Sequence, residues 1–418
     1  MKHIKYYIVI SCLLINTSSI VAQTLSLEEV LKTIQTDNPQ LKMYDADIQS
    51  MDAAAEGAKS WMAPQLTTGF FMTPYDSKLW KANEMGPGMG SYMLGISQMI
   101  PNASKLKADF KYMNAMSSVE AENKNYTQNE LNALAKTNYY QWLVLDKKIK
   151  IANENLLLLE YMIKSMEIRY QYNMDKLPTY YKAKSQFSAL ESMVVMLQND
   201  IAQKQILLNT LMARDKNTIF EIDPSYTLND FKEMKSDESS LAKNRSDVQA
   251  IEKTMALNQL KIEAEKTKLL PEFGVKYDHM FGFGEQPKQF SLMLMVNIPF
   301  APWSSKMNKA NRNSFEIKNE SLNWQKQMIL NEVSGMISGM STELNNLKKQ
   351  YDIADKSIIP ALKRNYDTSI LAWQNNTGDL FVVLDAWEAL NMAQIEKLDK
   401  LQIILSTQVA IEKQLENN

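Results

Sequence analysis

The sequence has very little cysteine, histidine, glycine and proline. Its one cysteine is Cys12, and its two histidines are His3 and His279. Residues 1–22 are expected to be removed, as the next paragraphs explain. The mature chain would then have His279 as its one histidine and no cysteine, which excludes disulfide and thiol chemistry. The chain also lacks a glycine-rich phosphate loop, so no recognisable catalytic set remains. We therefore expect a protein that is not an enzyme and that carries no cofactor.

An excess of one charge and a long apolar run are also absent. The formal net charge is −2, and no basic stripe suggests nucleic acid as a partner. Beyond residue 22, no segment reaches the roughly 18 uncharged apolar residues of a membrane-spanning helix. Twelve glycines and twelve prolines among 418 residues are few, which favours long uninterrupted helices.

Residues 1–22 are typical of a secretory signal. Lys2 and Lys5 form a basic start, and Tyr6–Ile15 is an apolar run that is too short to span a membrane as a helix. Val21-Ala22 supplies the small residues at which cleavage is expected. The mature protein is therefore expected either to be soluble in the periplasm or to be inserted in a membrane as strands.

The remaining sequence contains the same order of segments twice. After Asn38-Pro39 come a helical stretch, two alternating segments that end at Ile100-Pro101, and a long helical region. The order starts again at Arg245-Ser246, and its alternating segments end at Ile298-Pro299. One supersecondary unit that is used twice usually determines the architecture. We therefore divide the mature chain into a first repeat (23–216), a linker (217–240) and a second repeat (241–418).

Both repeats are predicted to contain long helices. In the first repeat, one stripe of residues has the three–four spacing of a coiled-coil seam, and a second stripe returns along it. The outgoing stripe is Leu131, Ala135, Asn138, Trp142, Leu145, Ile149, Ala152, Leu156, Leu159, Ile163, Met166 and Tyr170, and the return stripe is Ala183, Phe187, Leu190, Val194, Leu197, Ile201, Lys204, Leu208 and Leu211. The stripes predict an antiparallel helical hairpin at 103–213. The second repeat is predicted to have a helix at 246–270 and a matching hairpin at 304–416.

Four segments alternate between apolar and polar residues, near 65–73, 90–100, 272–281 and 289–300. In the last of them, apolar residues occupy every even position from Phe290 to Phe300. Such segments match membrane barrel strands, although a soluble sheet packed on helices would alternate in the same way. A spanning barrel needs about eight strands, and an open sheet edge cannot face lipid. Strands that span a membrane would therefore require several copies of this chain.

Several short motifs follow one another in a specific order. They are Leu25-Ser26-Leu27-Glu28-Glu29-Val30 before Asn38-Pro39, Pro64-Gln65-Leu66, Arg245-Ser246-Asp247-Val248, Leu269-Leu270-Pro271, Ile298-Pro299-Phe300 and Val383-Leu384-Asp385-Ala386. In their order and spacing, over nearly all of the mature sequence, the chain resembles the TolC-type outer-membrane efflux protein family.

The resemblance implies a mostly α-helical chain with a small β part. Long antiparallel coiled-coil hairpins would form a periplasmic tunnel, and four membrane strands per chain would contribute to a homotrimeric twelve-stranded β-barrel. The barrel would lie in the lipid of the outer membrane of a Gram-negative bacterium. The implied function is that of an exit duct, which receives small molecules or metal ions from an inner-membrane pump through a periplasmic adaptor protein.

The resemblance further implies that the tips of the two hairpins face the adaptor and the pump. Family members usually have a glycine ten residues before the alanine of the returning helix, where this chain has Asn173 and Asn376. Asparagine tolerates the left-handed backbone conformation that such a turn needs. The expected tip residues are Asn173, Met174, Asp175 and Lys176 in the first hairpin and Asn375, Asn376, Thr377, Gly378 and Asp379 in the second.

In this family, acidic side chains just inside the second tip often narrow the closed entrance. Asp385 occupies one such position, and Val382 occupies another that is often acidic. Three copies of Asp385 around an axis would attract cations, beside a partly apolar ring of Val382. The alternative interpretation is that Asp385 only caps or solvates the start of its helix.

Methionine is abundant, with 27 residues. On helices it is expected to fill irregular gaps in the core. Five methionines fall on the inward-facing side of the predicted strands, namely Met93, Met99, Met280, Met293 and Met295. Thioethers are soft ligands that favour Cu(I), so these residues are candidate metal ligands for copper or silver efflux. The alternative is that they are apolar filler in a crowded barrel.

A second class of function stays open at this point. A periplasmic coiled-coil adaptor or structural scaffold without a membrane barrel would have the same long helices. It would be soluble after cell breakage, whereas a channel would be an outer-membrane oligomer that conducts ions. The sequence identifies neither the pump nor the transported substrate.

Overall fold

A computed structural model describes residues 23–84, 86–172, 176–229, 231 and 238–416. The predicted signal at 1–22 lies outside these residues. The described chain divides into two compact units, and each unit takes segments from both repeats. The first unit consists of the described residues up to Ile34 with Asn138–Thr227 and Leu362–Leu398, and the second consists of Gln35–Thr137, Leu228–Ala361 and the residues from Asp399 onward.

The second unit contains a four-stranded antiparallel sheet. Its strands are β2 (Gln65–Phe71), β3 (Ser91–Ile100), β5 (Glu272–Gly282) and β6 (Gln289–Asn297), in the order β2-β3-β5-β6. Each predicted alternating segment therefore forms a strand. The central strands β3 and β5 come from different repeats, so the sheet joins the two copies. Strand β6 ends before residue 300, because Pro299 has no backbone N–H with which to continue the ladder.

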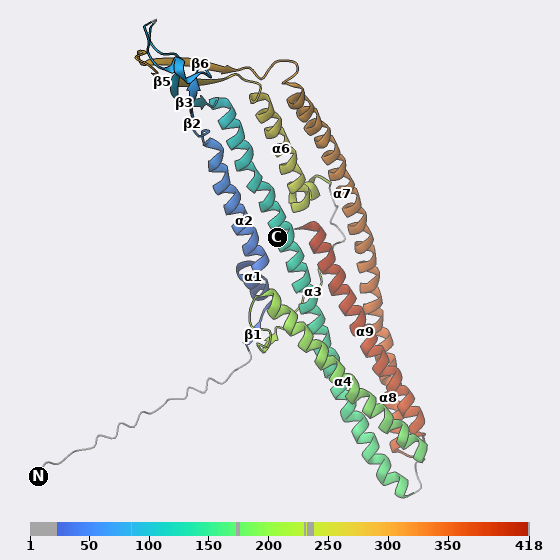
Figure 1. Cartoon of the computed structure of the whole chain (residues 1–418). Helices are drawn as coiled ribbons and strands as arrows, with labels where there is room; N and C mark the ends of the chain where they lie inside the picture. The colour runs from blue at the N-terminus through green and yellow to red at the C-terminus, as the bar shows by residue number, and fades with distance from the viewer. Residues whose placement is uncertain (1–22, 85, 173–175, 230, 232–237, 417–418) are drawn as a thin grey trace, which may run out of the picture. The chain divides into compact units, whose positions relative to one another are not determined.

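Four helices lead into this sheet, as Figure 1 shows. They are α2 (Pro39–Glu56), α3 (Ala103–Gln171), α6 (Ser246–Thr267) and α7 (Lys306–Ile353). Helix α2 begins where it does because the Asn38 side chain accepts a hydrogen bond from Gln40 N at 2.9 Å. Pro39 occupies the first turn, where a backbone N–H would have no helical partner in any case.

The hydrophobic core of the second unit lies among α6, α7, the short helix α5 (Glu238–Asn244) and the end of α9 (Leu380–Leu415). Its most deeply buried members are Leu241, Val248, Leu330, Val333, Ile337, Leu344, Ile404 and Ile411. On α7 the buried residues recur at intervals of three, four and seven, which is the period of one helix face. Helix α7 therefore packs one continuous face against this core.

The first unit contains a small sheet that the sequence patterns did not predict. Strand β1 (Gln23–Leu25) pairs in parallel with β4 (Phe220–Ile222), which lies in the segment expected to be an irregular linker. The hydroxyl of the buried Tyr139 donates to Leu25 O at 3.0 Å and accepts from Asp223 N at 3.0 Å. Burial also raises the pKa of Tyr139 to about 12. Tyr139 thus stays neutral and fastens both strands to α3.

The predicted stripes lie on the later part of α3 and on α4 (Leu177–Leu211). Ala152 and Leu159 of the outgoing stripe are buried, as are Ala183 and Leu190 of the return stripe. Each stripe has one polar member in its interior, and these two members meet. Lys204 Nζ donates to Asn138 Oδ1 at 3.2 Å. The two exceptions to the apolar pattern therefore satisfy one another.

Helix α7 does not pass directly into α8 (Ile359–Gln374). A π-helical turn, Ala354–Ile358, lies between the two helices and ends just before Pro360. Proline lacks a backbone N–H, and its ring collides with the carbonyl four residues earlier in a regular helix. The wider turn accommodates Pro360 without ending the helical path.

A buried polar network in the first unit yields a prediction about stability. Asn155 is 5 % exposed, and its Oδ1 accepts a hydrogen bond from Trp387 Nε1 at 2.7 Å, while its Nδ2 donates to Asn391 Oδ1 at 3.1 Å. Asn155→Ala leaves the buried indole N–H without an acceptor, which should cost about 1–3 kcal/mol. Thermal unfolding of the purified protein should show a lower midpoint for this variant.

The matched control is Asn153→Ala, at an exposed position of the same helix. This change should alter the free energy of unfolding by less than about 0.5 kcal/mol. Equal shifts for the two variants would show that the bond from Trp387 to Asn155 does not stabilise the first unit.

Candidate functional site

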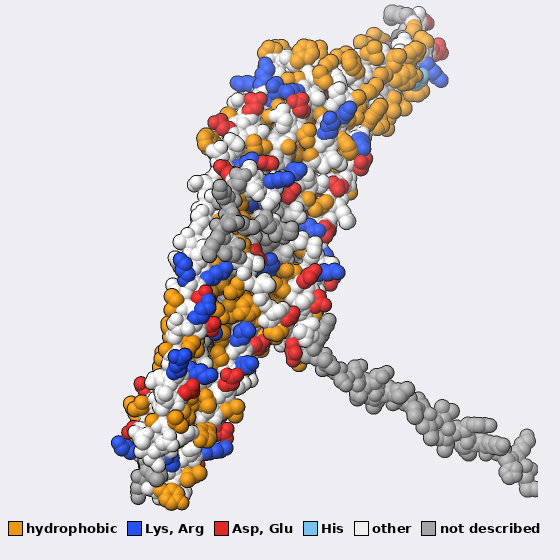
Figure 2. Space-filling model, turned by 180° about the vertical axis from the view of Figure 1, so that it is seen from behind, with side chains coloured by type: hydrophobic (Ala, Val, Ile, Leu, Met, Phe, Trp, Pro, Cys, Tyr) orange, Lys and Arg blue, Asp and Glu red, His pale blue; other side chains and the backbone are white. Residues whose placement is uncertain are grey.

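One face of the four-stranded sheet is apolar and exposed. The register places Phe70, Tyr92 and Phe281 in one cross-strand row and Ile96, Tyr277 and Leu292 in another. On β6, Leu294 is 81 % exposed and Phe290 is 69 % exposed. Figure 2 shows hydrophobic side chains gathered over the sheet. A contiguous exposed apolar surface of this kind marks a site of contact with lipid or with another protein.

The opposite face of the same strands carries the five methionines singled out by the sequence. Met93 lies opposite Met280, Met293 lies opposite Lys276, and Met99 and Met295 lie on either side of Gly274. Because successive side chains of a strand point to opposite faces, all five share the face that alternates with the apolar one. The structure thus brings together on one surface residues that are up to about two hundred positions apart in the chain.

Two of these methionines meet over a glycine. A Cβ atom at residue 274 would lie 2.5 Å from Met99 Sδ and 3.0 Å from Met295 Cε. Gly274 therefore leaves the space in which side chains from β3 and β6 approach each other across β5. Any residue with a side chain at this position would push the pair apart.

The methionine face also carries an ion pair that the sequence reasoning did not single out. Lys276 Nζ lies 3.1 Å from Asp278 Oδ2, and the Asp278 side chain is 1 % exposed. Asp278 Oδ1 has no hydrogen-bond partner within the part of the chain that the structure describes. A signal was present in the sequence, because two opposite charges at alternate positions of a predicted strand must share one face.

The second tip, between α8 and α9, closes with a left-handed asparagine. Asn376 has φ 61°, which confirms the conformation expected from the sequence. Thr377 N and Gly378 N both donate to Ala372 O, at 2.9 and 3.1 Å. The carbonyl oxygen of Ala372, near the end of α8, therefore accepts two hydrogen bonds. The tip is therefore a hydrogen-bonded turn with a defined backbone path.

Asp379 connects this turn to α9 and to the first tip. Its Oδ1 accepts from Phe381 N at 2.8 Å and so caps α9. Its Oδ2 lies 3.9 Å from Lys176 Nζ. Asn375 is exposed on the second tip. The remaining predicted tip residues, Asn173, Met174 and Asp175, lie outside the described residues.

The predicted gate residues lie close together at the start of α9. Val382 and Asp385 are three residues apart and both are exposed, so they occupy one face of the helix. The N-terminal cap of α9 is Asp379 and not Asp385. On α4, Lys182 occupies the position that matches Asp385 in the other repeat, and its Nζ lies 3.9 Å from Glu388 Oε2. The two repeats thus present opposite charges just inside their tips.

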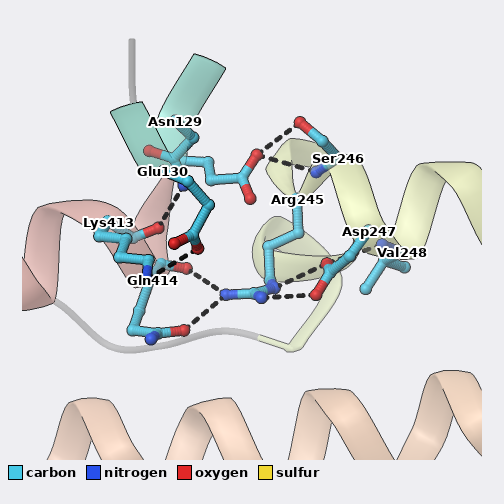
Figure 3. A network of polar contacts seen from close by, with 9 residues as sticks. Asn129, Glu130, Arg245, Ser246, Asp247, Val248, Lys413 and Gln414 are labelled. Carbon is cyan, nitrogen blue, oxygen red and sulfur yellow. Dashed lines mark hydrogen bonds and ion pairs between the residues drawn. The ribbon is translucent and has the colours of Figure 1, made fainter. Parts of the chain in front are cut away.

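A buried polar network ties the start of α6 to the end of α9 (Figure 3). Arg245 donates to both carboxylate oxygens of Asp247, at 3.0 and 2.6 Å, and to the main-chain and side-chain oxygens of Gln414, both at 2.8 Å. Glu416 Oε2 accepts from Ser246 N and Ser246 Oγ, at 2.9 and 2.6 Å. Through these contacts the Arg245-Ser246-Asp247 motif joins the start of the second repeat to its end.

A polar cavity of about 200 Å³ lies beside this network. Lys413 and Glu130, which line it, form an ion pair of 2.7 Å. Glu416 Oε1 faces no hydrogen-bond partner among the described residues. Burial raises the pKa of the Glu416 carboxyl above its ordinary value, although the hydrogen bonds from Ser246 and the charge of Arg245 oppose this shift.

The described residues contain neither a membrane-spanning helix nor a cluster of the usual metal-binding side chains. No helix there is both long enough and apolar enough to cross a membrane. No three histidine, cysteine, aspartate or glutamate side chains of that part of the chain gather where they could hold a metal ion.

The family model for outer membrane efflux proteins matches residues 30–214. No curated protein sequence matches the chain. Among solved structures, the chain is similar to three outer-membrane proteins at 14 % identity. These are VceC of Vibrio cholerae (TM-score 0.71, 93 % of this chain and 96 % of that one), the CmeC channel of Campylobacter jejuni (0.69, 93 % and 85 %) and the open MtrE channel of Neisseria gonorrhoeae (0.69, 93 % and 88 %). At this identity the likeness establishes a shared fold.

The buried carboxyl of Glu416 predicts a dependence of stability on pH. A carboxyl whose pKa is raised by folding binds its proton more tightly in the folded protein than in the unfolded chain. Its contribution to stability is present below the ordinary glutamate pKa of about 4.3, and it is lost as the pH rises through the folded pKa. Glu416→Gln, which stays uncharged, should therefore unfold at a higher temperature than the native protein near pH 8, with little difference near pH 4.

The exposed Glu320→Gln on α7 is the control, and it should leave the midpoint unchanged at both pH values. A gain for Glu416→Gln that is as large at pH 4 as at pH 8 would contradict a pKa raised by burial.

Proposed function

Because the family model for outer membrane efflux proteins matches residues 30–214 of this chain, we propose that three copies of it form the exit duct of a tripartite efflux system. The duct lies in the outer membrane of a Gram-negative bacterium and extends into the periplasm. It receives small molecules or metal ions from an inner-membrane pump, to which a periplasmic adaptor protein connects it. In this role the protein conducts its cargo and catalyses no reaction.

The exposed apolar face of the sheet is the observation that carries this proposal. Contact with water costs about 25 cal/mol for each Å² of apolar surface, whereas the outer wall of a membrane barrel needs such a surface. Strands β2 and β6 are the two edges of the sheet in the part of the chain that the structure describes, and an open edge cannot face lipid. Three copies joined edge to edge pair these edges and close a twelve-stranded barrel.

The helices supply the periplasmic part of the duct in this proposal. The long helices α3, α4 and α7 to α9 form coiled-coil hairpins that together surround a tunnel. Their tips, with Lys176 and residues 375–379, face the adaptor and the pump. The Asn376 turn and the Asp379 cap support this role, because they hold the second tip in one conformation.

A periplasmic adaptor or scaffold without a barrel is the rival proposal. It accounts for the long helices, but it leaves the apolar face of the sheet without a partner. The solved structures that share the fold are outer-membrane proteins, which supports the duct.

The methionine face favours soft monovalent metal ions as one class of cargo. Once the apolar face contacts lipid, the opposite face lines the lumen, and it carries Met93, Met99, Met280, Met293 and Met295. Thioether sulfur favours Cu(I) over the hard divalent cations, which prefer oxygen ligands. The alternative, that these methionines only fill space, predicts that leucine can replace them without any effect on metal tolerance.

Fractionation and conductance test the duct directly. After cell breakage the protein should sediment with the outer membrane, and the purified oligomer should conduct ions in planar lipid bilayers. Leu294→Arg puts a charge on the apolar face, which should cost roughly 2–4 kcal/mol in lipid and prevent insertion. Ser291→Arg on the same strand faces the lumen and should still insert. A soluble protein without conductance would support the rival proposal.

The gate proposal has a separate test. Three Asp385 carboxylates near the axis attract cations, so Asp385→Asn should lower the preference for K⁺ over Cl⁻ and change the single-channel conductance. Asp47→Asn makes the same change of charge at an exposed position of α2 and is the control. Equal effects of the two variants, or no effect of Asp385→Asn, would remove Asp385 from the constriction.

A further inference from the structure

Asp278 is a buried carboxylate that is only half satisfied. Its Oδ2 pairs with Lys276 Nζ at 3.1 Å, and its side chain is 1 % exposed. Its Oδ1 has no hydrogen-bond partner in the described ranges of the chain. Leaving a buried charged oxygen unpaired costs free energy, so such an atom in a native protein points to a partner that is not part of the chain.

The sheet is shaped to hold this carboxylate flat against its surface. Asp278 pairs with Gly95 on the neighbouring strand. A Cβ atom at residue 95 would overlap Asp278 Oδ1. The side chain of Asp278 therefore lies across β3 in the space that Gly95 leaves. The glycine makes room for the charged group, in the same way that Gly274 makes room for Met99 and Met295.

Three methionines are same-face neighbours of the carboxylate, and Ser291 lies directly opposite it on β6. Met280 is two residues away on β5, Met93 is opposite Met280 on β3, and Met293 is opposite Lys276 on β6. Same-face neighbours on adjacent strands have Cβ atoms roughly 5–8 Å apart, which is within reach of long side chains. Methionine is unbranched and adapts to irregular spaces, so these sulfur atoms can turn toward an ion at Asp278 Oδ1.

We propose that Asp278, Met93, Met280 and Met293 form a binding site for a soft monovalent metal ion, Cu(I) or Ag(I), on the inner face of the barrel. The inference rests on the proposed duct, which turns this face toward the lumen. Each chain carries one such site.

The composition of the site selects its ion. Thioethers favour Cu(I) and Ag(I), while Ca²⁺ and Mg²⁺ prefer cages of oxygen ligands. The negative charge of the carboxylate attracts the metal ion and strengthens its binding, which neutral thioethers alone would leave weak. Lys276 occupies the other carboxylate oxygen and repels a cation, which weakens binding. A conducting site must bind an ion well enough to admit it and weakly enough to release it.

Planar-bilayer currents of the purified oligomer in chloride-free KNO₃ solution, with AgNO₃ added, test the site. We expect Ag(I) to reduce the current of the native protein. Asp278→Asn should raise the half-effective Ag(I) concentration by about tenfold, which corresponds to roughly 1.4 kcal/mol of lost binding. The triple change of Met93, Met280 and Met293 to leucine, and Gly95→Ala, should each have a similar effect.

The matched control is the triple change of Met43, Met307 and Met328 to leucine, which removes three exposed thioethers from helices α2 and α7 rather than from the sheet. Its response to Ag(I) should equal that of the native protein. Equal losses in the control and in the triple leucine variant of the sheet, or no response to Ag(I) in any of the proteins, would overturn the site.

Isothermal titration calorimetry of the detergent-solubilised oligomer with AgNO₃ separates this inference from the proposed duct. Binding of Ag(I) that depends on Asp278, in a protein that conducts no ions, would support the metal site and refute the duct. A conducting protein that does not bind Ag(I) would support the duct and refute the metal site. If Asp278→Asn fails to fold, the triple leucine variant and Gly95→Ala still decide the question.

Discussion

The pairing of β3 with β5 is the interaction on which the rest of the structure depends. Each strand belongs to a different repeat, and a continuous antiparallel ladder joins Ser91–Ile100 to Phe273–Gly282. A shift of the register by one residue would move every side chain of one strand to the opposite face of the sheet, so that each face would carry both apolar and polar side chains. The observed register keeps pairs such as Ile96 with Tyr277 on the apolar face and Met93 with Met280 on the other. The separation of the exposed apolar surface from the methionine surface follows from that register.

Several buried polar groups of the described helices are paired with one another. Asn138 meets Lys204, Asn155 meets Trp387, and Arg245 has acceptors for its guanidinium in Asp247 and Gln414. Such pairing is expected, because a buried polar atom without a partner loses its hydrogen bonds to water. Glu416 and Asp278 each keep one carboxylate oxygen without a partner among the described residues. Asp278 does so on the face that we assign to the lumen, which is where a passing ion would supply the missing contact.

The duplication explains both the regularity of the structure and the places where it departs from symmetry. Each predicted repeat supplies two strands and helices that lead into the sheet, so one chain contains two sets of elements in the same order. The repeats differ just inside their tips, where Asp385 occupies one copy and Lys182 the other. They also differ on the sheet, where Lys276 and Asp278 belong to the second repeat alone. In the proposed duct, the shared pattern suffices for the wall, whereas selection of cargo needs the differences.

The sequence by itself determined the four long strands, the long helices and the left-handed turn at Asn376, because each depends on a local period or on the preference of one residue type. It could not indicate β1 and β4, since three residues are too few to show an alternation. Only the tertiary structure decided which polar residues meet. Lys204 reaches Asn138, and Asp278 lies across Gly95, through contacts between distant parts of the chain that no local pattern records. The methionines illustrate both contributions. Alternation in the sequence assigned them to one face of the sheet, and the register of the strands decided which of them are neighbours of Asp278.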